Sequence, residues 1–206
     1  MKKFFAAFLI ALFAVFNLTA ANNWYTQQFP PSLINASGKR TNTAAALHGK
    51  IVLVYFSASW CGPCRAFTPQ LVEFYKRVAK NSNIELVFVS SDRDSAAMMD
   101  YMKKDSMPWL AIPFDSGKRG AFKQAMQVRG IPTLVVFDAN GKVISKDARW
   151  DVTMLGPKAV TAWKSPNYKP LTYQDYMNKN KSSNSKNSSN DKKKNKKSKN
   201  KNKRSK

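Results

Sequence analysis

The stretch that decides the fold runs from Ile51 to Cys64 and reads IVLVYFSASWCGPC. Its first six residues, Ile51–Phe56, are apolar or aromatic with three β-branched side chains, which is typical of a strand buried on both faces. From Pro63 to Lys80, apolar residues recur at helical spacing, namely Phe67, Leu71, Phe74, Tyr75 and Val78. Pro69 lies inside that pattern, so we expect a kink there rather than the end of the helix. The stretch therefore predicts a buried strand, a short connection with two cysteines, and a helix.

Further elements are predicted on the C-terminal side of this stretch. They are a second buried strand, a helix with Ser95 as N-cap, a third strand, a hairpin turn and a returning strand, at Ile84–Val89, Ser95–Lys104, Thr133–Phe137, Asp138–Gly141 and Val143–Ser145. On the N-terminal side, Leu33–Ala36 predicts an edge strand. A β-α-β-α pattern followed by a hairpin predicts an α/β fold, a central mixed β-sheet flanked by helices on both faces.

Composition sets the limits of this domain. The chain has 206 residues, of which 43% are hydrophobic and 12% aromatic, which excludes a wholly disordered or collagen-like protein. Its net charge is +23, but 13 of the 35 basic residues fall in residues 178–206 together with only one acid. Residues 22–177 carry +9, and we expect them to form one domain.

The first 21 residues predict a cleaved signal peptide. Lys2 and Lys3 precede an apolar run of 13 residues, Phe4–Phe16, and small residues follow up to Ala21. A retained anchor and a buried core helix are the alternatives, although the run is shorter than the roughly 20 residues of a spanning helix. Cleavage would place the mature protein in a secreted or periplasmic location, where disulfides persist.

Residues 178–206 consist almost entirely of Lys, Asn and Ser, so they have nothing apolar to bury and predict a disordered tail. Such a tail attracts polyanions through counterion release, so an exported protein that binds an anionic surface through its tail is the alternative function. A solvated tail without a dedicated partner is the simpler interpretation. Because the tail has no aromatic side chain and only one Arg, Arg204, we expect no specific nucleic-acid recognition.

Cys61 and Cys64 are the only cysteines, and they lie where the buried strand meets the helix. A helix N-terminus lowers the pKa of a thiol, which makes Cys61 the candidate attacking thiol and Cys64 the resolving one. Pro63 suits the first helical turn because it lacks an N–H group. A structural disulfide or half of a metal site are the alternatives. A bridge over so short a loop removes little unfolded-state entropy, and His48 is the only His in the chain, so we expect no metal site. A Cys-x-x-Cys beside a βαβ pattern favours redox catalysis.

Trp60-Cys61-Gly62-Pro63-Cys64 resembles the active-site motif of thioredoxins, and Gly130-Ile131-Pro132-Thr133 resembles their cis-proline loop. Three further segments resemble the tryparedoxin/nucleoredoxin branch of that superfamily, namely Phe56–Cys61, Arg65–Leu71 and Met107–Phe114. The resemblance covers roughly residues 50–163. It implies a thioredoxin fold and dithiol–disulfide exchange, with no cofactor other than the Cys61–Cys64 disulfide.

The resemblance also implies the site residues. Trp60, Gly62, Pro63 and a cis Pro132 would support the cysteines, although Pro132 could instead be an ordinary trans residue that opens a strand. Trp60, Trp109 and Ile131 would dock the substrate, although either tryptophan could instead fill the core.

Two residues depart from the family pattern. Tyr55 stands six positions before Cys61, where many thioredoxins have a buried acid, and a tyrosine with a pKa near 10 is a poor proton acceptor at neutral pH. Glu73 and Asp92 are other acids whose position the sequence leaves open. Gly62 stands where known tryparedoxins usually have Pro.

We therefore expect a monomeric thiol–disulfide oxidoreductase that reduces disulfides in exported proteins. Its expected partners are disulfide-containing proteins and an electron donor, either a membrane-side reductase or a small thiol, because the compartment itself is oxidising. Oxidase or isomerase activity is the alternative direction of the same chemistry.

Overall fold

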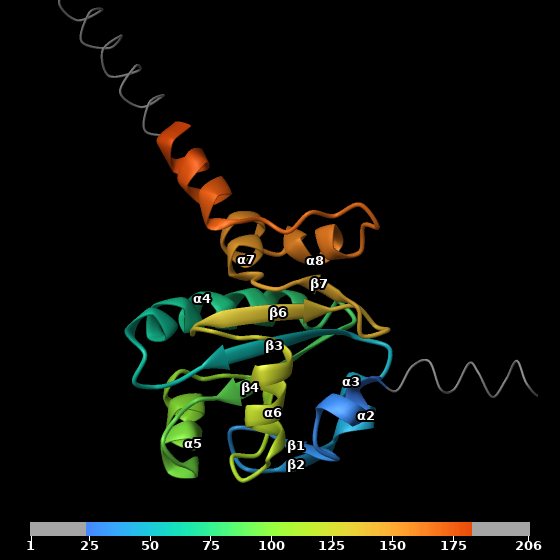
Figure 1. Ribbon diagram of the computed structural model, residues 1–206, viewed down its shortest axis with the longest axis vertical. Helices are drawn as coiled ribbons and strands as arrows, with labels where there is room; N and C mark the ends of the chain where they lie inside the picture. Colours follow the sequence, from blue (N-terminus) through green and yellow to red (C-terminus); the bar gives the residue numbers. More distant parts are fainter. Residues whose placement is uncertain (1–23, 183–206) are drawn as a thin grey trace, which may run out of the picture. The chain divides into compact units, whose positions relative to one another are not determined.

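The computed structural model describes residues 24–182, which divide into two compact units at Pro170 and Leu171 (Figure 1). The predicted signal peptide and residues 183–206 of the predicted tail lie outside the described residues. Residues 173–182 are helical, so the first five residues of the segment predicted to be disordered, 178–182, form part of a helix.

The first unit is built on one seven-stranded sheet with the order β2-β1-β5-β4-β3-β6-β7. β3 and β4 are a parallel central pair, β5 is parallel to β4, and β6 is antiparallel to β3. The strand bounds are β1 Ser32–Ile34, β2 Arg40–Asn42, β3 Ile51–Ser57, β4 Ile84–Ser90, β5 Leu110–Ala111, β6 Thr133–Phe137 and β7 Val143–Ser145. The predicted mixed sheet is confirmed, with each of the four main strands within one residue of its predicted bounds.

Strand β3 is buried along its whole length because both faces of the sheet are covered at this strand. Ile51, Leu53 and Tyr55 belong to one core cluster, whereas the alternate residues Val52, Val54 and Phe56 belong to the other. The period of two in a strand sends successive side chains to opposite faces. An uninterrupted apolar run is therefore what a central strand between two helical layers needs.

The helices divide between these two cores (Figure 1). One face is covered by α4 Gly62–Val78, α5 Ser95–Lys104, α7 Arg149–Leu155 and α8 Lys158–Trp163, and the other by α2 Trp24–Gln28, α3 Thr43–Leu47 and α6 Lys118–Ala125. The two predicted helices are confirmed, and Pro69 lies inside α4 as expected. The predicted N-cap of α5 is wrong by one residue: Asp94 accepts from the N–H of Ala97 at 2.8 Å, and Ser95 is the first helical residue.

The strand predicted at Leu33–Ala36 exists as β1, but it is not at the edge of the sheet. β2 pairs with its outer side, with Leu33 opposite Thr41, and β1 also pairs with β5. Asn35 ends the strand, because its side-chain oxygen accepts hydrogen bonds from the N–H groups of Ser37 and Lys39 and so closes a turn.

The predicted hairpin between β6 and β7 is present, and Asp138 holds it by accepting from the N–H groups of Asn140 and Lys142. Gly141 has a φ of +85°, and a Cβ atom there would collide with the Trp24 ring. Both the backbone conformation and the close approach of Trp24 therefore require glycine at this position.

Strand register brings three distant segments to one edge of the sheet. Ser57, at the end of β3, pairs with Ser90 at the end of parallel β4, and Phe56 pairs with Thr133 at the start of antiparallel β6. The loops after Ser57, after Ser90 and before Thr133 therefore meet at the carboxyl end of β3, which is where α4 begins.

Candidate active site

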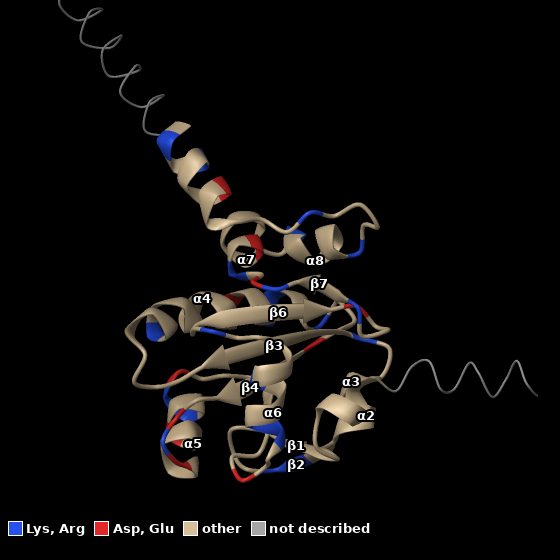
Figure 2. Cartoon of the chain, in the orientation of Figure 1, with Lys and Arg blue, Asp and Glu red and all other residues tan. Residues whose placement is uncertain are grey.

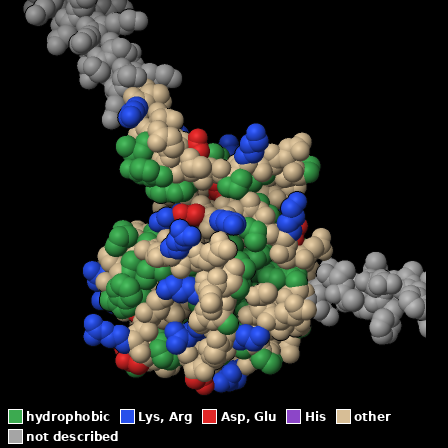
Figure 3. All heavy atoms as spheres, in the orientation of Figure 1, with side chains coloured by type: hydrophobic (Ala, Val, Ile, Leu, Met, Phe, Trp, Pro, Cys, Tyr) green, Lys and Arg blue, Asp and Glu red, His purple; other side chains and the backbone are tan. Residues whose placement is uncertain are grey.

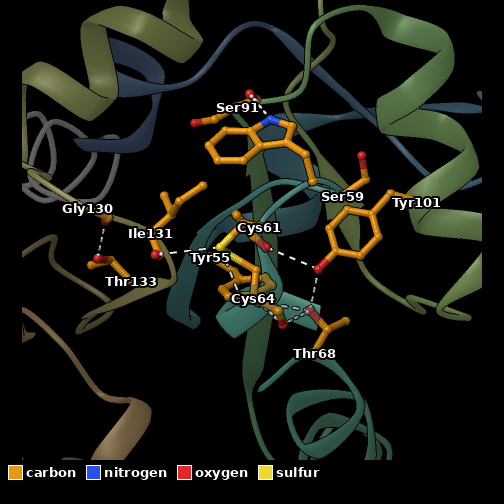
Figure 4. The surroundings of a disulfide bond; sticks show 12 residues. Tyr55, Ser59, Cys61, Cys64, Thr68, Ser91, Tyr101, Gly130, Ile131 and Thr133 are labelled. Carbon is orange, nitrogen blue, oxygen red and sulfur yellow. Dashed lines mark hydrogen bonds between the residues drawn. A yellow bond between two sulfur atoms is a disulfide. The ribbon is translucent and has the colours of Figure 1, made fainter. Parts of the chain in front are cut away.

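A disulfide joins Cys61 and Cys64 at this edge, with their Cα atoms 5.2 Å apart (Figure 4). Cys61 is 5% exposed and Cys64 is completely buried. Cys61 is therefore the sulfur that an incoming thiol or disulfide can reach, whereas Cys64 is enclosed behind it. Disulfide exchange in which Cys61 attacks and Cys64 resolves requires such an asymmetry, and the two roles remain a prediction.

Cys61 is the N-cap of α4. Its backbone is extended, at φ −86° and ψ 108°, and its Sγ accepts from the N–H of Cys64 at 3.3 Å. The same Sγ faces the positive end of the helix dipole, so a thiolate at Cys61 is stabilised there and its formation is favoured. Pro63 occupies the first turn of the helix, as predicted.

The loop before β6 lies against the disulfide. The Ile131–Pro132 peptide is cis, as the family resemblance implies, and the backbone oxygen of Ile131 lies 3.7 Å from the Sγ of Cys61. Ile131 packs on the small cluster formed by Ala58 and the two cysteines. Figure 4 shows Ile131 on one side of the disulfide, with Thr68 and Tyr101 on the other.

Trp60 is the most exposed large apolar side chain of residues 24–182, at 59%, and its indole N–H donates to the backbone oxygen of Ser91 at 3.1 Å. The ring is therefore held at the surface beside the disulfide. Trp109 is 1% exposed and packs between Tyr55 and Tyr75 in the core. The expectation that Trp109 docks the substrate is wrong, because the residue immediately before β5, a strand with no recognisable sequence pattern, lies in the interior.

Asp92 is a site residue that the sequence could not place. Its carboxylate is nearly buried and accepts from the N–H and the hydroxyl of Ser59, both at 2.7 Å, and from the hydroxyl of Ser90. It therefore ties the segment that leads into Trp60 and Cys61 to the end of β4. Glu73, the other acid considered, is exposed on α4 and pairs with Lys76.

Arg119 supports the same loop from α6. Its guanidinium lies over the Phe114 ring and donates to the backbone oxygens of Phe114 and Ser90. Burial lowers the pKa of Arg119, whereas the charges of Asp92 and Asp115 oppose that effect.

Tyr55 and its neighbours replace the buried acid with a network of hydroxyls. The Thr68 hydroxyl lies 2.8 Å from that of Tyr55 and 2.6 Å from that of Tyr101, and donates to the backbone oxygen of Cys64. The hydroxyl of Ser57 also belongs to the network and lies 3.2 Å from the hydroxyl of Tyr101. Burial raises the pKa of both tyrosines above the usual value, so they remain protonated at neutral pH. The network therefore meets Cys64 at its backbone oxygen, through hydroxyls that carry no charge at neutral pH.

No group of His, Cys, Asp and Glu side chains within residues 24–182 could hold a metal ion. Over the same residues, no helix is long and apolar enough to cross a membrane. Gly62 is exposed and has open space where a Cβ would stand, so packing does not demand glycine there.

Comparison with known proteins identifies the family. A family model described as thioredoxin-like matches residues 49–143. The chain is 45% identical over 116 residues to probable nucleoredoxin 1 of Arabidopsis thaliana, but covers only 20% of that protein, and it covers 28% of the Danio rerio nucleoredoxin. It is 42% identical over 120 residues to the tryparedoxin of Trypanosoma brucei brucei, covering 57% of this chain and 81% of that protein.

Solved structures of related proteins support the same family assignment. The tryparedoxin from Trypanosoma brucei superposes with a TM-score of 0.61 at 36% identity, over 68% of this chain and 96% of that one. A thioredoxin from Wuchereria bancrofti superposes with a TM-score of 0.58 at 37% identity, over 66% of this chain and 95% of that one. The predicted thioredoxin fold is confirmed, and the chain belongs to the thioredoxin-like family, with nucleoredoxins and tryparedoxins among its relatives.

Proposed function

We propose that this chain is a protein-disulfide oxidoreductase that reduces disulfides in exported proteins. The observation that carries the proposal is the placement of Cys61: it caps α4, is bonded to buried Cys64, and touches the cis-proline loop. Those features favour a thiolate at the accessible sulfur of Cys61. The sulfur of Cys64 is buried behind it, within bonding distance of Cys61.

In the reaction, the Cys61 thiolate attacks one sulfur of a substrate disulfide, and the other substrate sulfur leaves as a thiolate. The Cys64 thiolate then attacks Cys61, which releases the second substrate thiol and leaves the Cys61–Cys64 disulfide. Two electrons pass to the substrate, and no cofactor other than the two sulfurs takes part.

Cys64 must lose a proton in the second step. No charged group touches it within the hydroxyl network of Tyr55, Thr68 and Tyr101, and the tyrosines hold their own protons at neutral pH. The departing substrate thiolate is a base formed within reach of the pair, so we propose that it receives the Cys64 proton directly or through one water.

The oxidised pair must be reduced again, and we propose a thiol donor from outside the domain, either a membrane-side reductase or a small thiol. One structural neighbour is described as tryparedoxin II complexed with glutathionylspermidine, a small thiol compound. That relative supports the small-thiol class for this chain without fixing the compound.

We propose an exported location from the charged and apolar pattern of residues 1–21. Mass spectrometry of the protein recovered from the producing cell tests it: a mature chain that starts near Asn22 supports cleavage, and an intact Met1 contradicts it.

Reduction of insulin disulfides tests the activity. The Cys61→Ser variant should be inactive, and the Cys64→Ser variant should accumulate mixed disulfides that dithiothreitol releases. Retention of full activity in Cys61→Ser would refute the proposal, and a Cys64→Ser variant that captures nothing would refute the resolving role. The Cys61–Cys64 reduction potential sets the direction: a value near about −270 mV supports a reductase, and one near about −120 mV an oxidase.

A further inference from the structure

Two hollows flank the disulfide. One, of about 1020 Å³, lies between the start of α4 and α5 and is lined by Gly62. The other, of about 500 Å³, lies under the cis-proline loop and is lined by Pro63 and Pro132. Neighbouring residues of the active-site motif thus line opposite hollows, and the backbone from Gly62 to Pro63 forms a ridge between them.

Basic side chains rim both hollows, and all of them but Arg149 are exposed. Arg65, Lys103 and Lys104 line the first, together with Asp100 and Asp105. Arg129, Lys146 and Arg149 line the second, together with Asp147. Figure 2 shows both signs of charge on α5, and Figure 3 shows Lys and Arg side chains over the face in view.

Most of these cations have no ion-pair partner among residues 24–182. Arg149 is neutralised by Asp147, which accepts from two of its nitrogens. Ion pairs also join Lys50 to Glu85 and Lys76 to Glu73, away from both hollows. Asp105 is the acid most engaged with the rim: burial raises its pKa, whereas the charges of Lys104 and Arg65 lower it.

Helix stability explains only some of this charge. Lys103 and Lys104 lie in the last turn of α5, where a positive charge interacts favourably with the helix dipole and stabilises the helix. Arg65 stands in the first turn of α4, where a cation opposes the dipole, and Arg129 and Lys146 lie outside any helix. These three cations therefore contribute nothing to helix stability, and they lie on both sides of a reactive sulfur. Such an arrangement points to an anionic ligand.

We propose that the preferred substrate is a disulfide within an acidic polypeptide segment that crosses the Gly62–Pro63 ridge and places carboxylates in both hollows. The inference rests on the proposed function and names its substrate class. A polypeptide fits better than a small anionic thiol, because a small molecule occupies one hollow whereas a chain that presents its disulfide to Cys61 extends to both sides. Exposed Trp60 adds an apolar surface beside the same ridge.

Three peptides test the charge preference. Each has the same length and one internal disulfide, and they differ only in whether the flanking residues are Glu, Gln or Lys. The full-length protein is reduced, freed of reductant and mixed with each peptide, and the peptide thiols formed in a single turnover are measured against time. At low ionic strength the Glu peptide should react about tenfold or more faster than the Lys peptide, and high salt should shrink that ratio.

Paired variants locate the preference. Lys103→Gln with Lys104→Gln neutralises the first hollow, and Arg129→Gln with Lys146→Gln neutralises the second. Lys142→Gln with Lys164→Gln is the matched control, because both exposed lysines line a hollow beside Ile51, at the far end of β3 from the disulfide. Each site pair should lower the Glu-to-Gln rate ratio several-fold, and the control should leave it unchanged.

Failure of the inference is separable from failure of the proposed function. Equal rates for the Glu, Gln and Lys peptides would overturn the acidic preference while the activity stands. A preference that falls equally in the control and site variants would assign it to overall charge and overturn the two-hollow site. Glutathione disulfide reacting as fast as the Glu peptide would overturn the polypeptide class. If none of the peptides is reduced, the proposed function itself fails.

Discussion

The carboxylate of Asp92 accepts two hydrogen bonds from Ser59, one from its N–H and one from its hydroxyl, each at 2.7 Å. The bonds join residues 33 positions apart and hold the chain two residues before the reactive sulfur. A nearly buried carboxylate with several donors is costly to lose, because its partners stay behind without an acceptor.

The Asp92→Ala variant should therefore lose about 1–3 kcal/mol of unfolding free energy, measured by urea denaturation, and should reduce insulin more slowly because Trp60 and Cys61 lose their support. The control is Glu73→Ala, whose side chain is 64% exposed and pairs with Lys76 only at 3.9 Å. Equal stability of the two variants would contradict the positioning role of Asp92.

The two tryptophans should separate stability from activity. The Trp109→Ala variant should lose about 3–5 kcal/mol of unfolding free energy, because it empties a core position between two tyrosines. Trp60→Ala should change stability by less than about 1 kcal/mol, since its indole makes one hydrogen bond at the surface, yet it should slow the reduction of peptide disulfides. A Trp60→Ala variant that reacts at the original rate would rule out docking by that ring.

Buried tyrosines should make the fold sensitive to alkali. Burial raises the pKa values of Tyr55 and Tyr75 in the folded state, and the charge of Glu85 adds to the rise at Tyr75. Above a pH of about 10 the unfolded chain releases these protons and the folded chain keeps them, so stability is complete below that pH and falls as pH rises, by up to about 1.4 kcal/mol per pH unit for each tyrosine.

Urea denaturation between neutral pH and pH of about 11 measures this loss. Tyr55→Phe and Tyr75→Phe should each flatten the dependence on pH, whereas exposed Tyr173, replaced by Phe, serves as the control. An unchanged slope in both buried-site variants would contradict the assignment.

The Gly62→Pro variant should be tolerated and should gain about 0.4–1 kcal/mol of unfolding free energy, because proline restricts the unfolded chain. Cys61 already has the extended backbone that precedes proline, and space is open at position 62. Ala66→Pro, one turn further along α4, should instead cost about 3 kcal/mol. A strong loss of stability in Gly62→Pro would show that the motif needs glycine for its backbone.

Removal of residues 183–206 should leave insulin reduction unchanged and weaken retention on a polyanionic resin. That segment holds 11 basic residues and one acid, and binding driven by counterion release falls steeply with salt. A full-length variant with these basic residues replaced by Ser is the matched control for chain length. Slower catalysis in both would assign the tail a part in the reaction.

The sequence predicted well the main strands and the strand and helix that flank the cysteine pair, because a strand buried on both faces and a long amphipathic helix leave strong patterns. It missed β5, whose two residues, Leu110 and Ala111, are too short for any period. The misassignment of Trp109 follows from that omission, since its burial depends on where β5 pairs. Asp92 could not be placed because its partners meet only through the register of β3 and β4.

The antiparallel pairing of β6 with β3 has a consequence for when the chemistry becomes available. The pairing of Phe56 with Thr133 brings the backbone oxygen of Ile131 to the sulfur of Cys61, across about a third of the chain. Before that pairing forms, the cis-proline loop does not lie against the two cysteines. The contact between this loop and the sulfur therefore depends on the completed tertiary structure, and a chain in which β6 has not yet paired with β3 lacks it.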